Sequence, residues 1–166
     1  MSEIPQLSAD GIDPKMVEAM IRQGIPYCAA LGVEVIEVKR SHVTLSLPYN
    51  PDLVGDPANG ILHGGAITSL VDSVAGMAVF AAMQKLQAVA TLDLRIDYLK
   101  PALAHKAVYA TAECYKLTRS IAFVRARAYH PDTPDDLVAN CVATFMIGSS
   151  DKPPLPKGTK IPGVQA

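Results

Sequence analysis

Asp72 is the sole ionisable residue between His63 and Lys85, in a segment made almost entirely of apolar and small residues. A carboxylate among hydrocarbon side chains costs free energy unless it is hydrogen-bonded or takes part in chemistry as a base or nucleophile. The competing interpretation is a structural aspartate that bonds to the backbone or to a group of a partner subunit. The pattern favours a functional Asp72.

A glycine-rich run, Gly60-Ile61-Leu62-His63-Gly64-Gly65, ends where a long helix is predicted to begin. Glycines let a ligand approach the backbone closely, and the first amides of a helix lack internal partners. These amides lie at the positive end of the helix dipole, where they can hold a developing oxyanion such as that of a thioester under attack. The competing interpretation is a tight loop-to-helix turn that binds no ligand.

Gly64 and Asp72 are eight positions apart, which places them about 12 Å apart along one helix axis. A single thioester carbonyl cannot reach both, because its oxyanion donor and its attacking group must lie within about 3 to 3.5 Å. If both residues act, the helix end of one subunit must meet the middle of its partner's helix across a two-fold axis. We therefore predict a homodimer, and that the site needs both subunits.

The helix that carries Asp72 is predicted from Gly64 to about Gln84, with apolar residues on every face, so we expect it to be buried. A membrane span is the competing interpretation of its length. Thr68, Ser69, Ser73 and Gly76 interrupt the apolar run of about 20 residues that a span requires. No membrane association is therefore expected.

Six strand-like runs flank the long helix, at 33–38, 43–47, 89–99, 107–117, 121–130 and 137–147. A short leading helix is predicted from Asp13 to about Gln23, ended by Pro26. Residues 50–60 are predicted to form a loop, and 130–136 a longer turn. One long apolar helix among about six antiparallel strands predicts an α+β fold whose sheet curls around that helix.

One polar face is predicted on the strand after the long helix. Thr91, Asp93, Arg95 and Asp97 alternate there with Leu92, Leu94 and Ile96. The alternation indicates a solvated or interfacial face.

Composition limits the classes of partner. Lys and Arg total 15 against 16 for Asp and Glu, a formal charge of -1, so nucleic acid is not expected as a partner. The three cysteines are far apart and lack metal-ligand spacing, which predicts reduced core residues and no metal. No secretory signal is visible, so a cytoplasmic location is expected.

The three other histidines, His42, His105 and His130, are interpreted as surface residues at turns.

The sequence resembles the PaaI-like branch of the hotdog-fold acyl-CoA thioesterases from about Leu31 to Gly148. The residues that carry this resemblance are Gly55-Asp56-Pro57-Ala58-Asn59-Gly60, His63-Gly64-Gly65, Leu70-Val71-Asp72, Thr91-Leu92-Asp93 and Tyr98-Leu99-Lys100-Pro101. The resemblance implies a hotdog fold, an acyl-CoA substrate and no cofactor. It also leads us to expect that homodimers pair into a dimer of dimers, a homotetramer.

The resemblance also assigns roles to single residues. It implies that the Gly64 backbone N–H donates to the thioester carbonyl and that His63 helps to fix the loop and that carbonyl. Asp72 would attack the carbonyl directly or activate water, and the hydroxyl of Thr91 would orient water or an intermediate. Gly65, beside Gly64 in the same turn, is expected to contribute to substrate binding.

The residue that positions water and the role of Arg119 each have two interpretations. Many relatives place an asparagine before the histidine to position the hydrolytic water, and here either Asp56 or Asn59 offers that side chain. Arg119 belongs to a basic group at the hairpin near residue 119. That group either contacts the phosphates of CoA or keeps the surface soluble.

The predicted organisation is an N-terminal helical segment at 1–30, a thioesterase domain at 31–148 and a flexible Pro- and Lys-rich tail at 149–166. The predicted activity is hydrolysis of an acyl-CoA to free acid and CoA. Two alternatives are a non-catalytic acyl-CoA-binding or assembly module of the same fold, and a hydratase or dehydratase of that fold.

Overall fold

The computed structural model describes residues 12–148, so the predicted tail at 149–166 lies outside the described residues. Its elements in chain order up to the long helix are α1 (Pro14–Ala19), the π-helical turn η1 (Met20–Gly24), α2 (Pro26–Leu31), β1 (Glu34–Lys39), β2 (His42–Leu47), the 3-10 turn η2 (Pro51–Leu53), β3 (Val54–Asp56) and β4 (Ile61–Leu62). The remaining elements are α3 (Gly64–Ala82), β5 (Val89–Tyr98), β6 (Val108–Leu117), β7 (Ile121–His130) and β8 (Thr133–Ile147).

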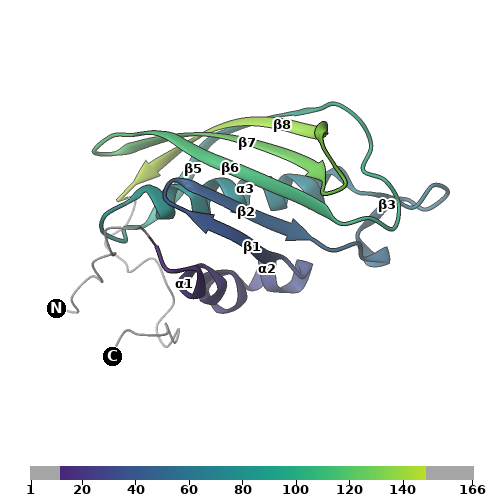
Figure 1. Ribbon diagram of the computed structural model, residues 1–166, viewed down its shortest axis with the longest axis horizontal. Coiled ribbons are helices and arrows are strands. Elements are labelled where there is room, and N and C mark those ends of the chain that lie inside the picture. The colour runs from purple at the N-terminus through teal and green to yellow at the C-terminus, as the bar shows by residue number, and fades with distance from the viewer. Residues whose placement is uncertain (1–11, 149–166) are drawn as a thin grey trace.

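The main sheet has six strands in the order β1-β2-β6-β7-β8-β5, and each neighbouring pair is antiparallel. It wraps around α3, while α1 packs against β1 and α2 against α3 (Figure 1). The predicted α+β architecture is confirmed. By length and composition α3 resembles a membrane span, but 61% of its apolar window is buried within the domain, as in the core helix of a folded domain.

The N-terminal segment differs from the prediction at Pro26. The leading helix begins as expected, with the Asp13 carboxylate accepting a hydrogen bond from the Lys15 amide at 2.8 Å. Pro26 does follow its end, but it also starts a second helix, α2, that the sequence did not reveal. Proline suits the first helical position because its ring fixes φ and the missing N–H has no partner there anyway. Gly32, at φ 74°, ends α2 in the left-handed region.

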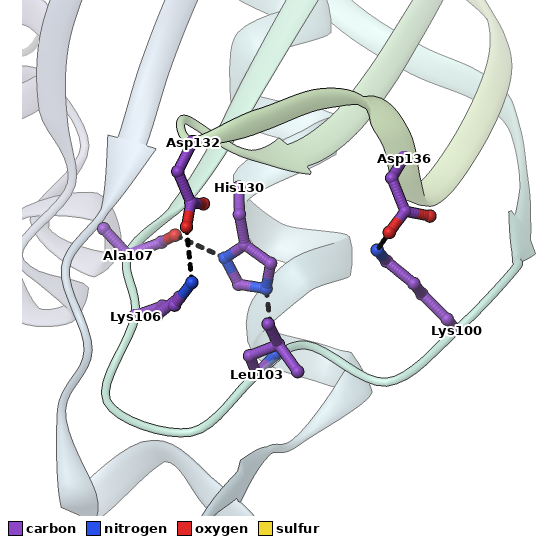
Figure 2. A network of polar contacts seen from close by, with 7 residues as sticks. All are labelled: Lys100, Leu103, Lys106, Ala107, His130, Asp132 and Asp136. Carbon is purple, nitrogen blue, oxygen red and sulfur yellow. Dashed lines mark hydrogen bonds and ion pairs between the residues drawn. The ribbon is translucent and has the colours of Figure 1, made fainter.

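The predicted longer turn at 130–136 is wrong. His130 pairs with Thr133, so Pro131 and Asp132 alone connect β7 to β8, and β8 begins at Thr133. Ion pairs of Asp132 with Lys106 and of Asp136 with Lys100 join this hairpin to the segment between β5 and β6 (Figure 2). The predicted loop at 50–60 likewise contains a short strand, β3, that pairs with β4.

A β-bulge at Leu92 changes the predicted faces of β5. The register with β8 shifts between Thr91 and Asp93, and the alternation of side chains changes phase there. Thr91 therefore faces α3, as do Leu94 and Tyr98 after the bulge. The expectation that Thr91 shares one face with Asp93 is wrong.

His130 is fully buried, so its interpretation as a surface residue is wrong. Its Nε2 accepts a hydrogen bond from the Leu103 amide at 2.9 Å, and its Nδ1 lies 2.8 Å from the Ala107 carbonyl oxygen (Figure 2). The Leu103 contact leaves the proton of the neutral ring on Nδ1, which donates to Ala107. The imidazole thus fastens the segment between β5 and β6 to the end of β7.

Replacing His130 with alanine is expected to destabilise the protein by about 2 to 5 kcal/mol, because it leaves the Leu103 N–H and Ala107 C=O without their buried partner. Chemical denaturation measures this change. His42→Ala is the matched control, since the His42 side chain is half exposed and its Nε2 lies 3.7 Å from the Glu113 carboxylate. Equal free energies of unfolding for the two variants would contradict a clamping role for His130.

Candidate active site

The N-terminus of α3 is built by His63, Gly64 and Gly65. His63 is the N-cap, and its Nδ1 accepts a hydrogen bond from the Gly65 amide at 2.9 Å. Gly64 is the first helical residue, so its amide has no partner inside the helix. The three predicted residues thus lie together, with the His63 ring holding the turn.

Tyr98 contacts this helix end, although the sequence suggested no role for it. Its hydroxyl donates to the Gly64 carbonyl at 2.6 Å and lies 2.6 Å from the Thr68 hydroxyl. A Cβ added to Gly64 would lie 3.2 Å from the Tyr98 hydroxyl oxygen, a tight contact. Tyr98 faces inward because of the bulge at Leu92, and the alternation of residues in the sequence does not reveal that bulge.

Asp72 is half-buried in the middle of α3, rather than sealed in the core as its apolar surroundings in the sequence suggested. The Thr91 hydroxyl donates to its Oδ1 at 3.0 Å. Both residues open into a pocket of about 280 Å³. The pocket is lined by Ile25, Tyr27, Cys28, Ser69, Asp72, Ser73, Gly76, Met77, Val89, Thr91 and Phe145. The predicted proximity of Thr91 to the carboxylate is therefore present.

The thiol of Cys28 also lines this pocket. Its sulfur lies 3.1 Å from the Ser73 hydroxyl, and burial raises the pKa of the thiol. Burial likewise raises the pKa of Cys141 to about 11, and Cys114 is also a free, buried thiol. A neutral thiol is a weak nucleophile, so Asp72 is the better candidate for the attacking or activating group.

Gly64 and Asp72 open into different pockets of the same chain. A pocket of about 410 Å³ at the helix end is lined by Ile61, Leu62, Gly64, Ile67, Tyr98, Leu99, Lys100, Pro101 and Ala102. It shares no lining residue with the pocket at Asp72. Gly64 and Asp72 of one chain therefore line separate pockets.

Asp56 and Asn59, the two predicted candidates for holding water, are bonded to each other. The Asn59 amide donates to Asp56 Oδ2 at 2.8 Å, and the Ala58 N–H donates to Oδ1 at 3.1 Å. The Asn59 hydrogen bond lowers the pKa of Asp56 below its ordinary value. Asn59 lines a third pocket, with Tyr49 and His105, and the chain does not bring either residue to the pocket at Asp72.

Arg119 lies exposed in the turn between β6 and β7. The Ile147 amide donates to the Ser120 carbonyl at 2.8 Å, which places this turn at the end of the sheet where β5 starts, near Thr91. Two further arginines of this hairpin, Arg125 and Arg127, each cover an aromatic ring instead. Arg125 lies over Tyr115 with 4.4 Å to the ring centroid, and Arg127 over Tyr129 with 5.7 Å.

Within residues 12–148, no group of three or more His, Cys, Asp or Glu side chains is placed to hold a metal ion. The chemical groups of the site are a half-buried carboxylate, a hydroxyl and a helix-terminal amide. This set suits addition to a carbonyl carbon.

Comparison with known proteins finds similar chains. The family model of the Thioesterase superfamily matches residues 59–135. The medium/long-chain acyl-CoA thioesterase YigI of Salmonella typhimurium is 29% identical over 147 residues, covering 81% of this chain and 93% of that protein.

Two solved structures have a similar fold. A crystal structure of a protein from Pseudomonas aeruginosa has a TM-score of 0.72 and 37% identity, covering 81% of this chain and 98% of the other. A mutant of the phenylacetic acid degradation protein PaaI from Thermus thermophilus has a TM-score of 0.64 and 26% identity, covering 74% of this chain and 98% of the other.

Proposed function

This chain belongs to the hotdog-fold thioesterase superfamily, and from that premise we propose that it hydrolyses an acyl-CoA thioester to the free acid and CoA. The main support for this proposal is the position of Asp72, whose carboxylate accepts a hydrogen bond from the Thr91 hydroxyl and lines a pocket beside the core helix. The relative from Salmonella typhimurium is named as an acyl-CoA thioesterase, which supports this class of substrate.

In the proposed reaction, the Gly64 amide stabilises the oxyanion that forms when the thioester carbon is attacked. Asp72 acts either as a general base that takes a proton from water, or as the nucleophile that forms an anhydride which water then hydrolyses. In both cases the C–S bond breaks, CoA leaves as the thiolate and takes up a proton, and water supplies the oxygen of the acid. Thr91 keeps the carboxylate oriented.

The same proposal requires two subunits, because Gly64 and Asp72 of one chain open into separate pockets. Within residues 12–148, no strand pairs with the outer edge of β5. Antiparallel pairing of this edge with its copy, centred on Leu94, would set Asp93 opposite Arg95 of the partner subunit. It would also bring the Thr91 end of one strand beside the Tyr98 end of the other. Because Thr91 contacts Asp72 and Tyr98 contacts Gly64, this pairing would bring Asp72 toward the helix end of the second subunit.

The geometry favours hydrolysis over the hydratase alternative. A hydratase of this fold pairs a catalytic histidine with an acid, but His63 Nδ1 already accepts the Gly65 amide. The neutral ring then carries its proton on Nε2 and offers no free basic nitrogen to a substrate. His63 is better suited to positioning the helix end.

A panel of aliphatic and aromatic CoA esters, assayed for free thiol with purified protein, tests the proposed function. Thiol release well above the spontaneous rate is expected for at least one class of ester. Absence of release across the panel would favour the non-catalytic acyl-CoA-binding module.

Three further properties stay predictions. They are the pairing of dimers into tetramers, the contact of Arg119 with CoA phosphates and a cytoplasmic location.

A further inference from the structure

The pocket at Asp72 follows one stripe of α3. Its lining residues on the helix are Ser69, Asp72, Ser73, Gly76 and Met77, spaced as one helical face. The first three carry polar groups, and beyond them the lining becomes apolar. Met77 is joined there by Val89 and Phe145 from the sheet, so the pocket has a polar end at the carboxylate and an apolar end further along the helix.

Gly76 is unexpected in this place, because glycine destabilises the interior of a helix relative to alanine. Its backbone is helical, so no left-handed conformation calls for glycine. A Cβ added there would meet only Phe145 Cε1, at 3.9 Å, which is an ordinary van der Waals contact. By contrast, a Cβ at Gly55 would lie 2.8 Å from the His63 backbone. Neither conformation nor packing within the chain explains Gly76.

The space that Gly76 leaves empty belongs to the pocket. It lies one helical turn, about 6 Å along the axis, beyond Asp72 and away from the polar end. We propose that Gly76 is a specificity-determining residue that keeps this space open for a linear aliphatic acyl chain, which runs from the thioester at Asp72 along α3 toward Met77 and Phe145. This inference rests on the proposed function and names the substrate class of the same site.

The pocket suits such a chain at its apolar end. Its described lining beyond Asp72 carries no charge, so methylenes displace water without leaving a charge unsolvated. The N-terminal segment contributes Ile25 and Tyr27 to the same pocket, and Tyr27 is 60% exposed. These residues precede the part of the chain that matches the family model. Residues outside that core therefore help to build the pocket, and Tyr27 does so at its polar end, where its hydroxyl lies 3.5 Å from that of Ser69.

Calorimetric titration with two unreactive thioethers, S-ethyl-CoA and S-octyl-CoA, tests the inference without any turnover. Each buried methylene contributes about fourfold to affinity, so the wild-type protein is expected to bind S-octyl-CoA more tightly. Gly76→Leu fills the pocket and is expected to reduce the ratio of the two affinities at least about tenfold, the loss of two or three buried methylenes. Gly76→Ala is expected to reduce it by a smaller factor.

Ala82→Leu is the matched control, because Ala82 is half-buried on α3 and does not line this pocket. It is expected to leave the affinity ratio unchanged. An unchanged ratio in folded Gly76→Leu, or in Gly76→Ala if the larger variant does not fold, would overturn the inference. So would failure of the wild-type protein to distinguish the two thioethers. If Gly76→Leu lowers the ratio of the two affinities but the wild-type protein hydrolyses no CoA ester, the role of Gly76 is supported and only the proposed function is contradicted.

Discussion

The Asp72→Asn variant is expected to lose about 10² to 10⁴ in kcat for its best CoA ester, the range that a positioned general base contributes. Asparagine has the size of aspartate and can still accept the hydrogen bond from Thr91. It cannot take a proton from water or attack the carbonyl as a carboxylate. Thiol-release kinetics under saturating substrate measure the loss, and KM is expected to change little.

Asp135→Asn is the matched control for this substitution. Asp135 is exposed near the start of β8, at the other end of the strand from Phe145, which lines the pocket, and its loss of charge is expected to leave kcat unchanged. Thermal denaturation and the oligomeric state of both variants establish that the fold is intact. Undiminished kcat in Asp72→Asn would remove this carboxylate from the mechanism and leave it a structural partner of Thr91.

The Gly64→Pro variant is expected to lose about 10² to 10³ in kcat, the usual effect of removing one oxyanion donor. Proline deletes the amide hydrogen and is well suited to the first position of a helix. The preceding residue, His63, has φ -62° and ψ 134°, an extended conformation that proline permits at the residue before it. The same assay measures this loss.

Gly64→Ala separates loss of the donor from the added side-chain atoms, because it adds the same Cβ near the Tyr98 hydroxyl but keeps the N–H. Alanine is therefore expected to retain most of the activity that proline removes. Equal losses in the two variants would indicate that crowding against Tyr98, and not the missing donor, lowers the rate.

Much of the fold could be predicted because it follows from periodicity. The apolar helix beginning at Gly64 and the six main strands have clear patterns, and the structure confirms them. The misses arise where tertiary contacts override local signals. Pro26 both follows one helix and begins another, and the proline and aspartates after His130 indicated a loose turn where strand pairing continues to Thr133.

The candidate site was only partly accessible from the sequence for a similar reason. The spacing along the helix was enough to predict that Gly64 and Asp72 of one chain lie apart. The predicted enzyme class, a thioester hydrolase, is confirmed by the comparisons. The inward position of Tyr98 depends on a one-residue bulge at Leu92, which alternation alone cannot reveal. The burial of His130 likewise depends on the Leu103 amide, which lies 27 positions away in the chain.

In the proposed site, the Asp72 carboxylate of one subunit acts together with the Gly64 amide at the helix end of the other. Mixed dimers of Gly64→Pro and Asp72→Asn are the critical test of this shared site. Each mixed dimer would contain one site with both native residues and one with neither. Random reassembly of equal amounts is therefore expected to restore about a quarter of the wild-type activity per subunit. Activity no greater than the sum of the two parent variants, in dimers shown to be mixed, would contradict the shared site.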